Sequence, residues 1–279
     1  MANSATQMKS EGMKIAVLLT CHNRKDQTLE CLAGLSVQTL RDEILISVVL
    51  MDDGSSDGTS EAVAGCYPEV EILRGCGDLY WCGGMRAAWQ HAARLDPDYY
   101  LLLNDDTVLD PSAVQRLLDI CSSSDCPIIS VAAIRDPETG AHTYGGVRGA
   151  NTAVPVSGRL EACETFNANA VLIPRVVYEE QGGFHDVYTH AMGDFDYGYQ
   201  ASRNGIRLIQ SAESLGTCGR NSPAGTWRDT SLSRRERFRK LQSPKGLPFK
   251  QWVLYNRRNS GCLWPYRCIT PYLRILLGR

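Results

Sequence analysis

The chain has 279 residues, of which 43% are hydrophobic, and this excludes a disordered polypeptide because such a composition can supply a core. Its formal net charge of −2 hides a strong asymmetry. Residues 226–279 contain 13 Lys or Arg against two acidic residues, a local charge of +11, so the first 225 residues carry −13. A basic segment of this kind indicates contact with a phosphate, a nucleic acid or an anionic membrane surface.

The eleven cysteines contain no CxxC pair, which argues against a zinc site or a redox loop. Their odd number and the lack of an N-terminal secretion signal favour the reducing cytoplasm. Residues 1–13 form a polar leader, and no run approaches the roughly 20 apolar residues of a membrane-spanning helix. We therefore expect a cytoplasmic protein, one that could lie peripherally at the inner face of a membrane without crossing it.

The N-terminal part alternates strands with helices. Residues 14–20 are a continuous apolar run, as a strand buried on both faces requires, and 26–38 carry apolar residues with helical spacing. A second apolar run covers 44–51. An acidic, glycine-rich turn at 52–59 then leads into a helix at 60–64. This order predicts a βαβ unit.

The same alternation continues downstream. The predicted elements are strands at 70–73, 99–103, 128–133 and 166–174, and helices at 84–94, from 110 onward and at 194–204. Residues 135–158 are rich in Gly, Pro, Thr and Asn, which predicts a loop or hairpin insertion. The whole pattern predicts an α/β fold with a mostly parallel central sheet and helices on both faces.

Three of the predicted strands end in polar clusters. These clusters are Thr20-Cys21-His22-Asn23, Asp52-Asp53 and Asn104-Asp105-Asp106. Ligands of open α/β sheets bind beyond the carboxyl ends of the strands, so we expect the three clusters to converge on one crevice.

Adjacent carboxylates at Asp105 and Asp106 are costly to hold unless a positive charge compensates them. Mg²⁺ or Mn²⁺ would do so, because these ions are held by one or two protein carboxylates together with substrate phosphates. The alternative is a turn or helix cap. Asp53 is similarly ambiguous, since it could accept from a ribose hydroxyl or a base imide, or cap the next helix.

Asp194 and Asp196 flank Phe195 at a predicted helix start, where acids are favoured by the helix dipole. The alternative is a general base that takes a proton from an acceptor hydroxyl, and the spacing allows only one of the two to face a reaction centre. Neither GxGxxG nor GxxxxGK[ST] is present, which argues against dinucleotide redox chemistry and P-loop phosphoryl transfer.

Taken in order, these segments resemble an inverting glycosyltransferase of family 2 with the GT-A fold, of the bacterial surface-polysaccharide type. The resemblance covers about residues 14–205 and rests on five segments: Thr20-Cys21-His22-Asn23-Arg24, the DDGSSDGT stretch at 52–59, Asn104-Asp105-Asp106, Gly182-Gly183-Phe184 and Gly193-Asp194-Phe195-Asp196. It implies a nucleotide-binding half at 14–110, an acceptor half at 111–217 and a basic C-terminal extension at 218–279.

The resemblance also implies residue roles. Asp106 is the ligand of Mn²⁺ or Mg²⁺, and Asp194 is the catalytic base. Thr20, His22 and Asp53 bind the base and ribose of the nucleotide, and Asp105 lies against the ribose or sugar. The full donor-binding set is Thr20, His22, Asn23, Arg24, Asp53, Gly83, Gly84, Asn104 and Asp105.

The sequence departs from the family pattern at three places. Gly193 stands where a Glu usually precedes the base, and a His usually found after the base helix is missing. Cys218 and Arg220 occupy that region, and Arg220 is the better candidate for a phosphate contact because a thiolate is a poor Mg²⁺ ligand. Trp81 lies in a predicted loop before a helix, where it could pack beside the donor or in the core.

The basic C-terminal segment combines Arg-rich residues 234–240 with aromatic and apolar residues at 264–277. It could cover a solvated helix, or bind an anionic membrane that presents a lipid-linked saccharide acceptor. No nucleic-acid module is recognisable, so nucleic acid is not an expected partner.

The expected function is metal-dependent transfer of a sugar from a UDP- or dTDP-sugar to a saccharide or lipid-linked saccharide. One alternative is a nucleotidyltransferase, but its Gly-rich basic signature is absent from residues 21–25. The other is a non-catalytic partner that binds a saccharide or another transferase.

Overall fold

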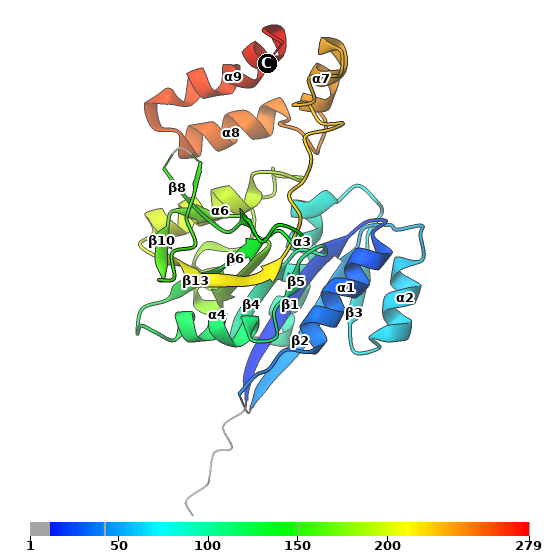
Figure 1. Cartoon of the computed structure of the whole chain (residues 1–279), viewed down its shortest axis with the longest axis vertical. Helices are drawn as coiled ribbons and strands as arrows, with labels where there is room; N and C mark the ends of the chain where they lie inside the picture. Colours follow the sequence, from blue (N-terminus) through cyan, green and yellow to red (C-terminus); the bar gives the residue numbers. More distant parts are fainter. Residues whose placement is uncertain (1–11, 42, 150, 279) are drawn as a thin grey trace, which may run out of the picture.

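The computed structural model describes residues 12–41, 43–149 and 151–278, so the expected leader at 1–13 lies outside the described residues except for its last two positions. One large twisted sheet forms the centre of the body (Figure 1). Its strand order is β10-β13-β6-β12-β4-β1-β2-β3. These strands are β1 (Met13–Cys21), β2 (Ile44–Asp52), β3 (Glu71–Arg74), β4 (Tyr99–Leu103), β6 (Ile128–Arg135), β10 (Glu161–Cys163), β12 (Ala170–Pro174) and β13 (Arg207–Thr217).

The half formed by β3, β2, β1 and β4 is parallel throughout. Ile15 to Leu19 of β1 are completely buried, as expected for an apolar run covered on both faces. The register pairs Cys21 with Asp52, so the polar residues that follow β1 and β2 start side by side at one edge of the sheet.

The other half of the sheet is mixed. β12 runs antiparallel to both β4 and β6, whereas β13 is parallel to β6. Residues 166–174, expected as one strand, are split into β11 (Thr165–Phe166) and β12. The predicted insertion at 135–158 contains three short strands: β7 (His142–Tyr144), β8 (Gly146–Arg148) and β9 (Thr152–Ala153). β5 (Val108–Leu109) pairs with the end of β13.

Helices cover both faces of the sheet (Figure 1). One face packs against α1 (Lys25–Ser36), α2 (Thr59–Cys66) and α4 (Ala113–Cys121). The other packs against α3 (Tyr80–Ala92), α5 (Arg175–Gln181) and α6 (Gly193–Arg203). Trp89 of α3 is fully buried there and stacks on Tyr178 at a centroid distance of 5.1 Å. α3 begins four residues earlier than predicted, which places residues 81–84 in its first turns rather than in a loop.

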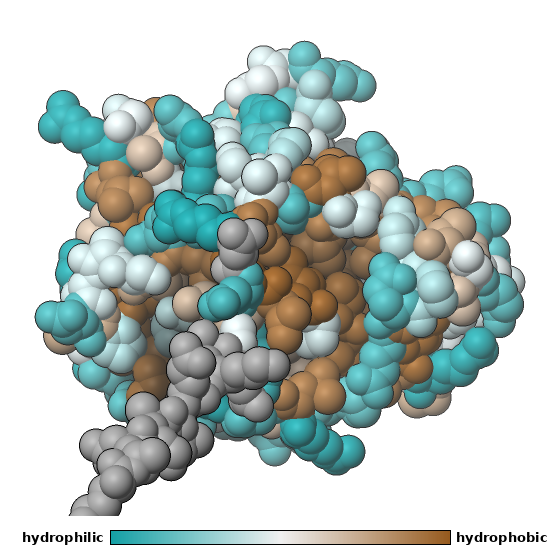
Figure 2. All heavy atoms as spheres, turned by 90° about the horizontal axis from the view of Figure 1, so that it is seen from below, coloured by the Kyte–Doolittle hydropathy of each residue, from teal (hydrophilic) through white to brown (hydrophobic). Residues whose placement is uncertain are grey.

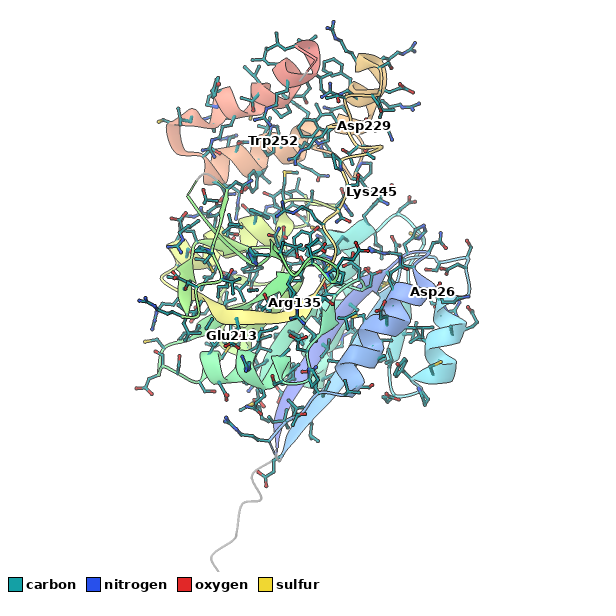
Figure 3. All side chains as sticks on the ribbon, in the orientation of Figure 1. Asp26, Arg135, Glu213, Asp229, Lys245 and Trp252 are labelled. Atoms are coloured by element: carbon teal, nitrogen blue, oxygen red, sulfur yellow. The ribbon has the colours of Figure 1, made fainter. Side chains whose placement is uncertain are left out.

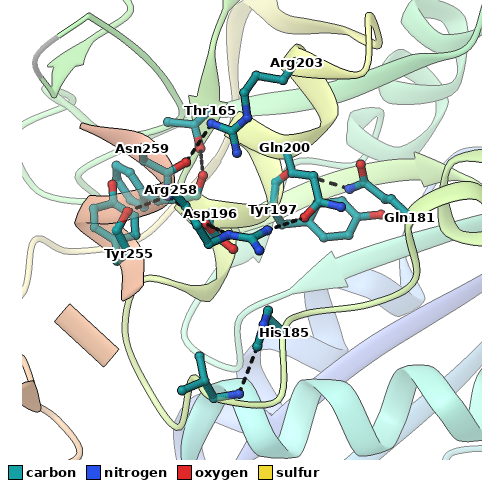
Figure 4. A network of polar contacts seen from close by, with 12 residues as sticks. Thr165, Gln181, His185, Asp196, Tyr197, Gln200, Arg203, Tyr255, Arg258 and Asn259 are labelled. Atoms are coloured by element: carbon teal, nitrogen blue, oxygen red, sulfur yellow. Dashed lines mark hydrogen bonds and ion pairs between the residues drawn. The ribbon is translucent and has the colours of Figure 1, made fainter. Parts of the chain in front are cut away.

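The basic C-terminal segment folds into α7 (Arg234–Leu241), α8 (Phe249–Asn259) and α9 (Trp264–Leu276), which lie together at the end of the molecule above α6 (Figure 1). α8 is fastened to α6 through Asp196. The Asp196 carboxylate pairs with Arg258 at 3.0 Å and accepts from the Asn259 amide at 2.7 Å (Figure 4). The C-terminal helices therefore pack on the body rather than extending from it.

The opposite end of the molecule, where β1 and β2 begin, exposes apolar side chains within a hydrophilic rim (Figure 2). Hydrophobic residues also line a pocket between α1, β2 and the segment that follows α2, among them Leu35, Ile46 and Val70. Within the described ranges, no helix reaches both the length and the hydropathy that crossing a bilayer requires.

Candidate active site

A pocket of about 440 Å³ opens at the carboxyl ends of the parallel strands. Its lining residues are Thr20, Cys21, His22, Arg24, Asp53, Gly77, Tyr80, Trp81, Asp105, His190, Ser243, Pro244 and Lys245. Five of the predicted donor-binding residues are among them, drawn from the segments after β1, β2 and β4. The three polar clusters thus meet at one hollow, at the place where ligands of α/β sheets bind.

The carboxylate of Asp53 holds the start of α3. It accepts backbone N–H bonds from Gly77 at 2.8 Å, Leu79 at 2.9 Å and Tyr80 at 2.8 Å. Asp53 therefore caps α3 and not α2, the helix that follows it first in the chain. Since a carboxylate has about four acceptor positions, the three N–H donors leave Asp53 room for one more.

His22 is fixed by the same segment. Its Nδ1 lies 2.6 Å from the backbone oxygen of Asp53, so this nitrogen carries the proton and donates. Its Nε2 then accepts from the side-chain amide of Asn23 at 3.1 Å, while Asn23 Oδ1 accepts from the backbone of Ser56 at 2.7 Å. Asn23 itself does not line the pocket, and it orders the loop beneath His22.

Gly84 and Gly83, both predicted to bind the donor, do not line the pocket either. A Cβ at Gly84 would collide with the Thr20 side chain, and one at Gly83 would lie 3.3 Å from the Cβ of Leu79. Gly84 therefore allows α3 to approach Thr20 of β1 closely, whereas Gly83 faces Leu79 at the start of α3.

Arg24 faces both acids that follow β4. Its guanidinium lies 3.2 Å from Asp105 and 2.7 Å from Asp106. Burial raises the pKa of Asp105 to about 7 even though the Arg24 charge lowers it. One oxygen of each carboxylate, Asp105 Oδ2 and Asp106 Oδ1, is buried without a hydrogen-bond partner. Two such oxygens suit a hard divalent cation.

No cluster of three or more His, Cys, Asp or Glu side chains suitable for a metal exists among the described residues. A metal at Asp105 and Asp106 would therefore depend on phosphate oxygens for its remaining ligands, as Mg²⁺ sites commonly do. Asn104, the first residue of this cluster, accepts from the indole of Trp81 at 2.8 Å and does not line the pocket. Trp81 lines the pocket and also packs against the apolar core.

Asp194 and Asp196 have different surroundings. Asp196 is 2% exposed, and its carboxylate forms an ion pair with Arg258 and accepts a hydrogen bond from Asn259. These contacts indicate a structural function for Asp196. Among the residues that the structure describes, the Asp194 carboxylate receives only backbone N–H bonds, from Phe195 at 2.9 Å and Ala168 at 3.3 Å. Burial raises the pKa of Asp194 to about 6. Asp194 is not among the residues that line the donor pocket, so its role as catalytic base stays a prediction, which the raised pKa of its carboxylate favours.

Comparison with known proteins decides the family. The sequence model of glycosyl transferase family 2 matches residues 16–153. Residues 16–153 therefore form a glycosyl transferase family 2 domain. Two relatives, the N-acetylglucosaminyl-diphospho-decaprenol L-rhamnosyltransferases of Mycobacterium tuberculosis strains CDC 1551 and H37Rv, are each 27% identical over 216 residues, or 66% of this chain and 69% of theirs. The protein is thus a glycosyltransferase.

Solved structures establish the fold. The mannosyltransferase PcManGT of Pyrobaculum calidifontis, in complex with GDP-Man and Mn²⁺, aligns over 97% of this chain and 75% of its own with a TM-score of 0.58 and 14% identity. S. aureus TarS 1–349 in complex with UDP-GlcNAc aligns over 95% and 73% with a TM-score of 0.59 and 13% identity. The predicted GT-A fold is confirmed.

Cys218 and Arg220 lie where the sequence departs from the family pattern, and the structure shows the surroundings of both. Burial, and next the charge of Asp106, raise the pKa of Cys218 to about 12, so its thiol is neutral beside the acids. Arg220, expected to contact phosphate, donates to the backbone oxygen of Thr143 at 3.3 Å and is not among the residues that line the donor pocket. A phosphate contact from Arg220 therefore stays a prediction that this geometry does not favour.

Several pocket residues were not anticipated from the sequence. The rings of Tyr80 and His190 form a T-shaped pair, with centroids 6.3 Å apart. Burial, and next the charge of Lys245, lower the pKa of His190 to about 4, so its ring is neutral. Ser243 to Lys245 come from the basic C-terminal segment. The only sequence signal for them was its positive charge, which does not indicate which lysine reaches the pocket.

Proposed function

We propose that this glycosyltransferase moves a hexosyl or deoxyhexosyl group from a UDP- or dTDP-sugar to a hydroxyl of a saccharide or lipid-linked saccharide, with inversion at the anomeric carbon. The observation that carries the proposal is one pocket lined both by Thr20, His22 and Asp53 and by Asp105, one of whose carboxylate oxygens is buried without a hydrogen-bond partner. The first set suits a nucleoside, and the second suits a metal-bound diphosphate.

In this proposal Asp194 takes the proton of the acceptor hydroxyl, and the oxygen bonds to the anomeric carbon of the donor. The bond from that carbon to the diphosphate breaks, and its electron pair leaves with the nucleoside diphosphate. Mn²⁺ or Mg²⁺ held by Asp106 and Asp105 would neutralise charge on the diphosphate. Asp194 suits the base role because it is partly buried and, within the described ranges, meets only backbone donors.

A lipid-linked acceptor is supported by the relatives and by the surface of α9. The mycobacterial relatives are named for transfer of L-rhamnose to an N-acetylglucosaminyl diphospho-lipid. Tyr266, Ile269, Leu273 and Leu276 lie along the outer side of α9 and are 42% to 66% exposed, whereas Cys268 is buried. An apolar stripe on a segment of charge +11 suits the surface of an anionic membrane. We therefore place the enzyme at the inner face of a membrane in this proposal.

Calorimetry with UDP and dTDP, each with and without Mn²⁺, tests the proposal. At least one nucleotide should bind in a metal-dependent manner, and Asp106→Ala should abolish that dependence. Asp125→Ala, an exposed aspartate outside the pocket, is the matched control and should bind like the parent. Absence of nucleotide binding by the parent with metal present would instead favour a non-catalytic saccharide- or transferase-binding partner on the same scaffold.

A further inference from the structure

The donor pocket is closed on one side by the segment between α7 and α8. Ser243, Pro244 and Lys245 all line it, and Lys245 lies between the body and α7 (Figure 3). This segment is 30 or more residues beyond the last motif of the family pattern. A basic residue has therefore been brought to the nucleotide site by the C-terminal helices.

The segment that carries Lys245 is held at both ends. Gly246 donates to the Ser243 oxygen at 2.8 Å, and Leu247 donates to the Leu241 oxygen at 2.7 Å. Gly246 packs so tightly against the end of α7 that a Cβ there would collide with backbone oxygens. The side chain of Leu247 packs both against the residues around Cys82 and against the core of the C-terminal helices. Lys245 is thus presented from an anchored turn.

Lys245 has no carboxylate partner in the described part of the chain, and this sets it apart from Arg24. Arg24 is engaged by Asp105 and Asp106, as described above. The charge of Lys245 reaches His190, whose pKa it lowers in addition to the larger effect of burial. An unpaired ammonium group beside a neutral ring can bind an anion without first breaking an ion pair.

The formal charges of the groups near the pocket indicate which anion Lys245 would bind. With both carboxylates ionised on a bound cation, Asp105 and Asp106 contribute −2, Arg24 contributes +1 and the divalent cation adds +2, so this cluster carries +1. The diphosphate of a sugar nucleotide carries −2, and it gains a further negative charge when the sugar leaves. The Lys245 ammonium would balance the bound donor and offset part of the charge that develops on the leaving group.

We propose that Lys245 binds the diphosphate of the nucleotide donor and stabilises the departing nucleoside diphosphate. The proposal rests on the proposed function of the same pocket. It assigns the diphosphate to the donor, because Lys245 shares one pocket with Thr20 and Asp53 on the nucleoside side. The basic C-terminal segment would then complete the active site as well as meet a membrane.

Calorimetry on the full-length protein with Mn²⁺ tests this. Lys245→Ala should weaken binding of the nucleoside diphosphate about tenfold, the scale of one charge-assisted contact. It should leave binding of the corresponding nucleoside monophosphate unchanged, and Lys245→Arg should restore most of the loss. Lys250→Ala is the matched control, since Lys250 is an exposed lysine of the same region outside the pocket, and it should bind like the parent.

The outcomes separate this proposal from the proposed function. If the parent binds no nucleotide with metal present, the proposed function fails before Lys245 is tested. If the parent binds and Lys245→Ala binds the diphosphate equally well, only the Lys245 proposal fails. If Lys245→Ala weakened binding of the nucleoside monophosphate and the nucleoside diphosphate equally, the effect would be structural and the Lys245 proposal would be overturned. Farnesyl diphosphate serves as a probe of the acceptor side, and a loss of its binding without loss of nucleoside diphosphate binding would also overturn the donor assignment.

Discussion

Gly193 has no side chain at the point where the sulfur of Cys82 lies. A Cβ at position 193 would stand 2.5 Å from Cys82 Sγ, closer than side chains approach. Cys82 is completely buried and donates to the backbone oxygen of His190 at 3.2 Å. The position next to the proposed base is therefore too crowded for the glutamate that the family pattern has there. Asp194 is held instead by backbone donors from Ala168 and Phe195.

The first prediction follows from that contact. Gly193→Ala should lower the free energy of unfolding by about 1–3 kcal/mol because it overpacks a buried site. Gly65→Ala is the control, since Gly65 lies in α2 with open space around its Cα, and Ala should raise stability there by about 0.5–1 kcal/mol. Urea denaturation of Gly193→Ala, Cys82→Ala and the double variant checks the contact. Strictly additive effects in this cycle would contradict it.

The second prediction concerns catalysis by Asp194. Asp194→Asn should keep nucleotide binding and lower kcat by about 10²–10⁴-fold, the usual share of a general base. In the parent, kcat should rise with pH and level off above about pH 6, because only the ionised carboxylate accepts a proton and its pKa is raised to about 6. Turnover by Asp194→Asn at the parental rate would remove Asp194 from the mechanism.

The same raised pKa predicts a change in stability with pH. The folded protein binds the Asp194 proton more tightly than the unfolded chain, whose aspartates titrate near 3.9. This contribution to stability is complete below pH 4 and is lost as the pH rises through about 6. Asparagine does not titrate, so the Asp194→Asn variant does not lose this stability as the pH rises. The Tm difference between variant and parent should therefore shift in favour of the variant from pH 4.5 to pH 7.5, by the equivalent of about 1–2 kcal/mol.

The parallel half of the fold could be predicted from the sequence because its signals are local. The apolar run of β1 ends at Cys21 and that of β2 at Asp52, and the parallel register that joins them follows from their βαβ order. β13 was not predicted, although residues 208–211 are buried. Polar residues such as Gln210 and Ser211 interrupt its apolar pattern, and tertiary hydrogen bonds satisfy them, to Gly146 and Ala133 respectively.

The residues of the candidate site also fall into two groups, those that the sequence could predict and those that it could not. Thr20 lies at the end of β1, and His22, Asp53 and Asp105 follow within two residues of strand ends, so the sequence places them at the sheet edge and the pocket contains them. Lys245 reaches the pocket only because α7 and α8 fold back over the body, which depends on contacts such as Asp196 with Arg258. Such long-range contacts leave no local pattern, and composition shows only that the segment is basic.

The fourth prediction concerns Arg24. Removing it leaves two largely buried carboxylates without their cation, so Arg24→Ala should lower Tm in metal-free buffer. Mn²⁺ should then raise Tm more in the variant than in the parent, because the ion supplies the missing positive charge. Arg41→Ala is the control, since it breaks an exposed pair with Asp119 and should change neither value appreciably. An equal Mn²⁺ response in parent and Arg24→Ala would argue against a metal at Asp105 and Asp106.

The last prediction concerns the outer stripe of α9. Replacing Ile269 and Leu273 with Ser should reduce co-sedimentation with vesicles that contain phosphatidylglycerol, about tenfold, since two exposed apolar side chains no longer enter the interface. Leu45→Ser is the matched control, because Leu45 is 59% exposed on β2 in the body of the protein. Binding of the parent should weaken as salt is raised, because the Arg and Lys side chains attract anionic headgroups. Equal sedimentation of the parent with neutral phosphatidylcholine vesicles, or undiminished binding by the double variant, would show that α9 is not the docking surface.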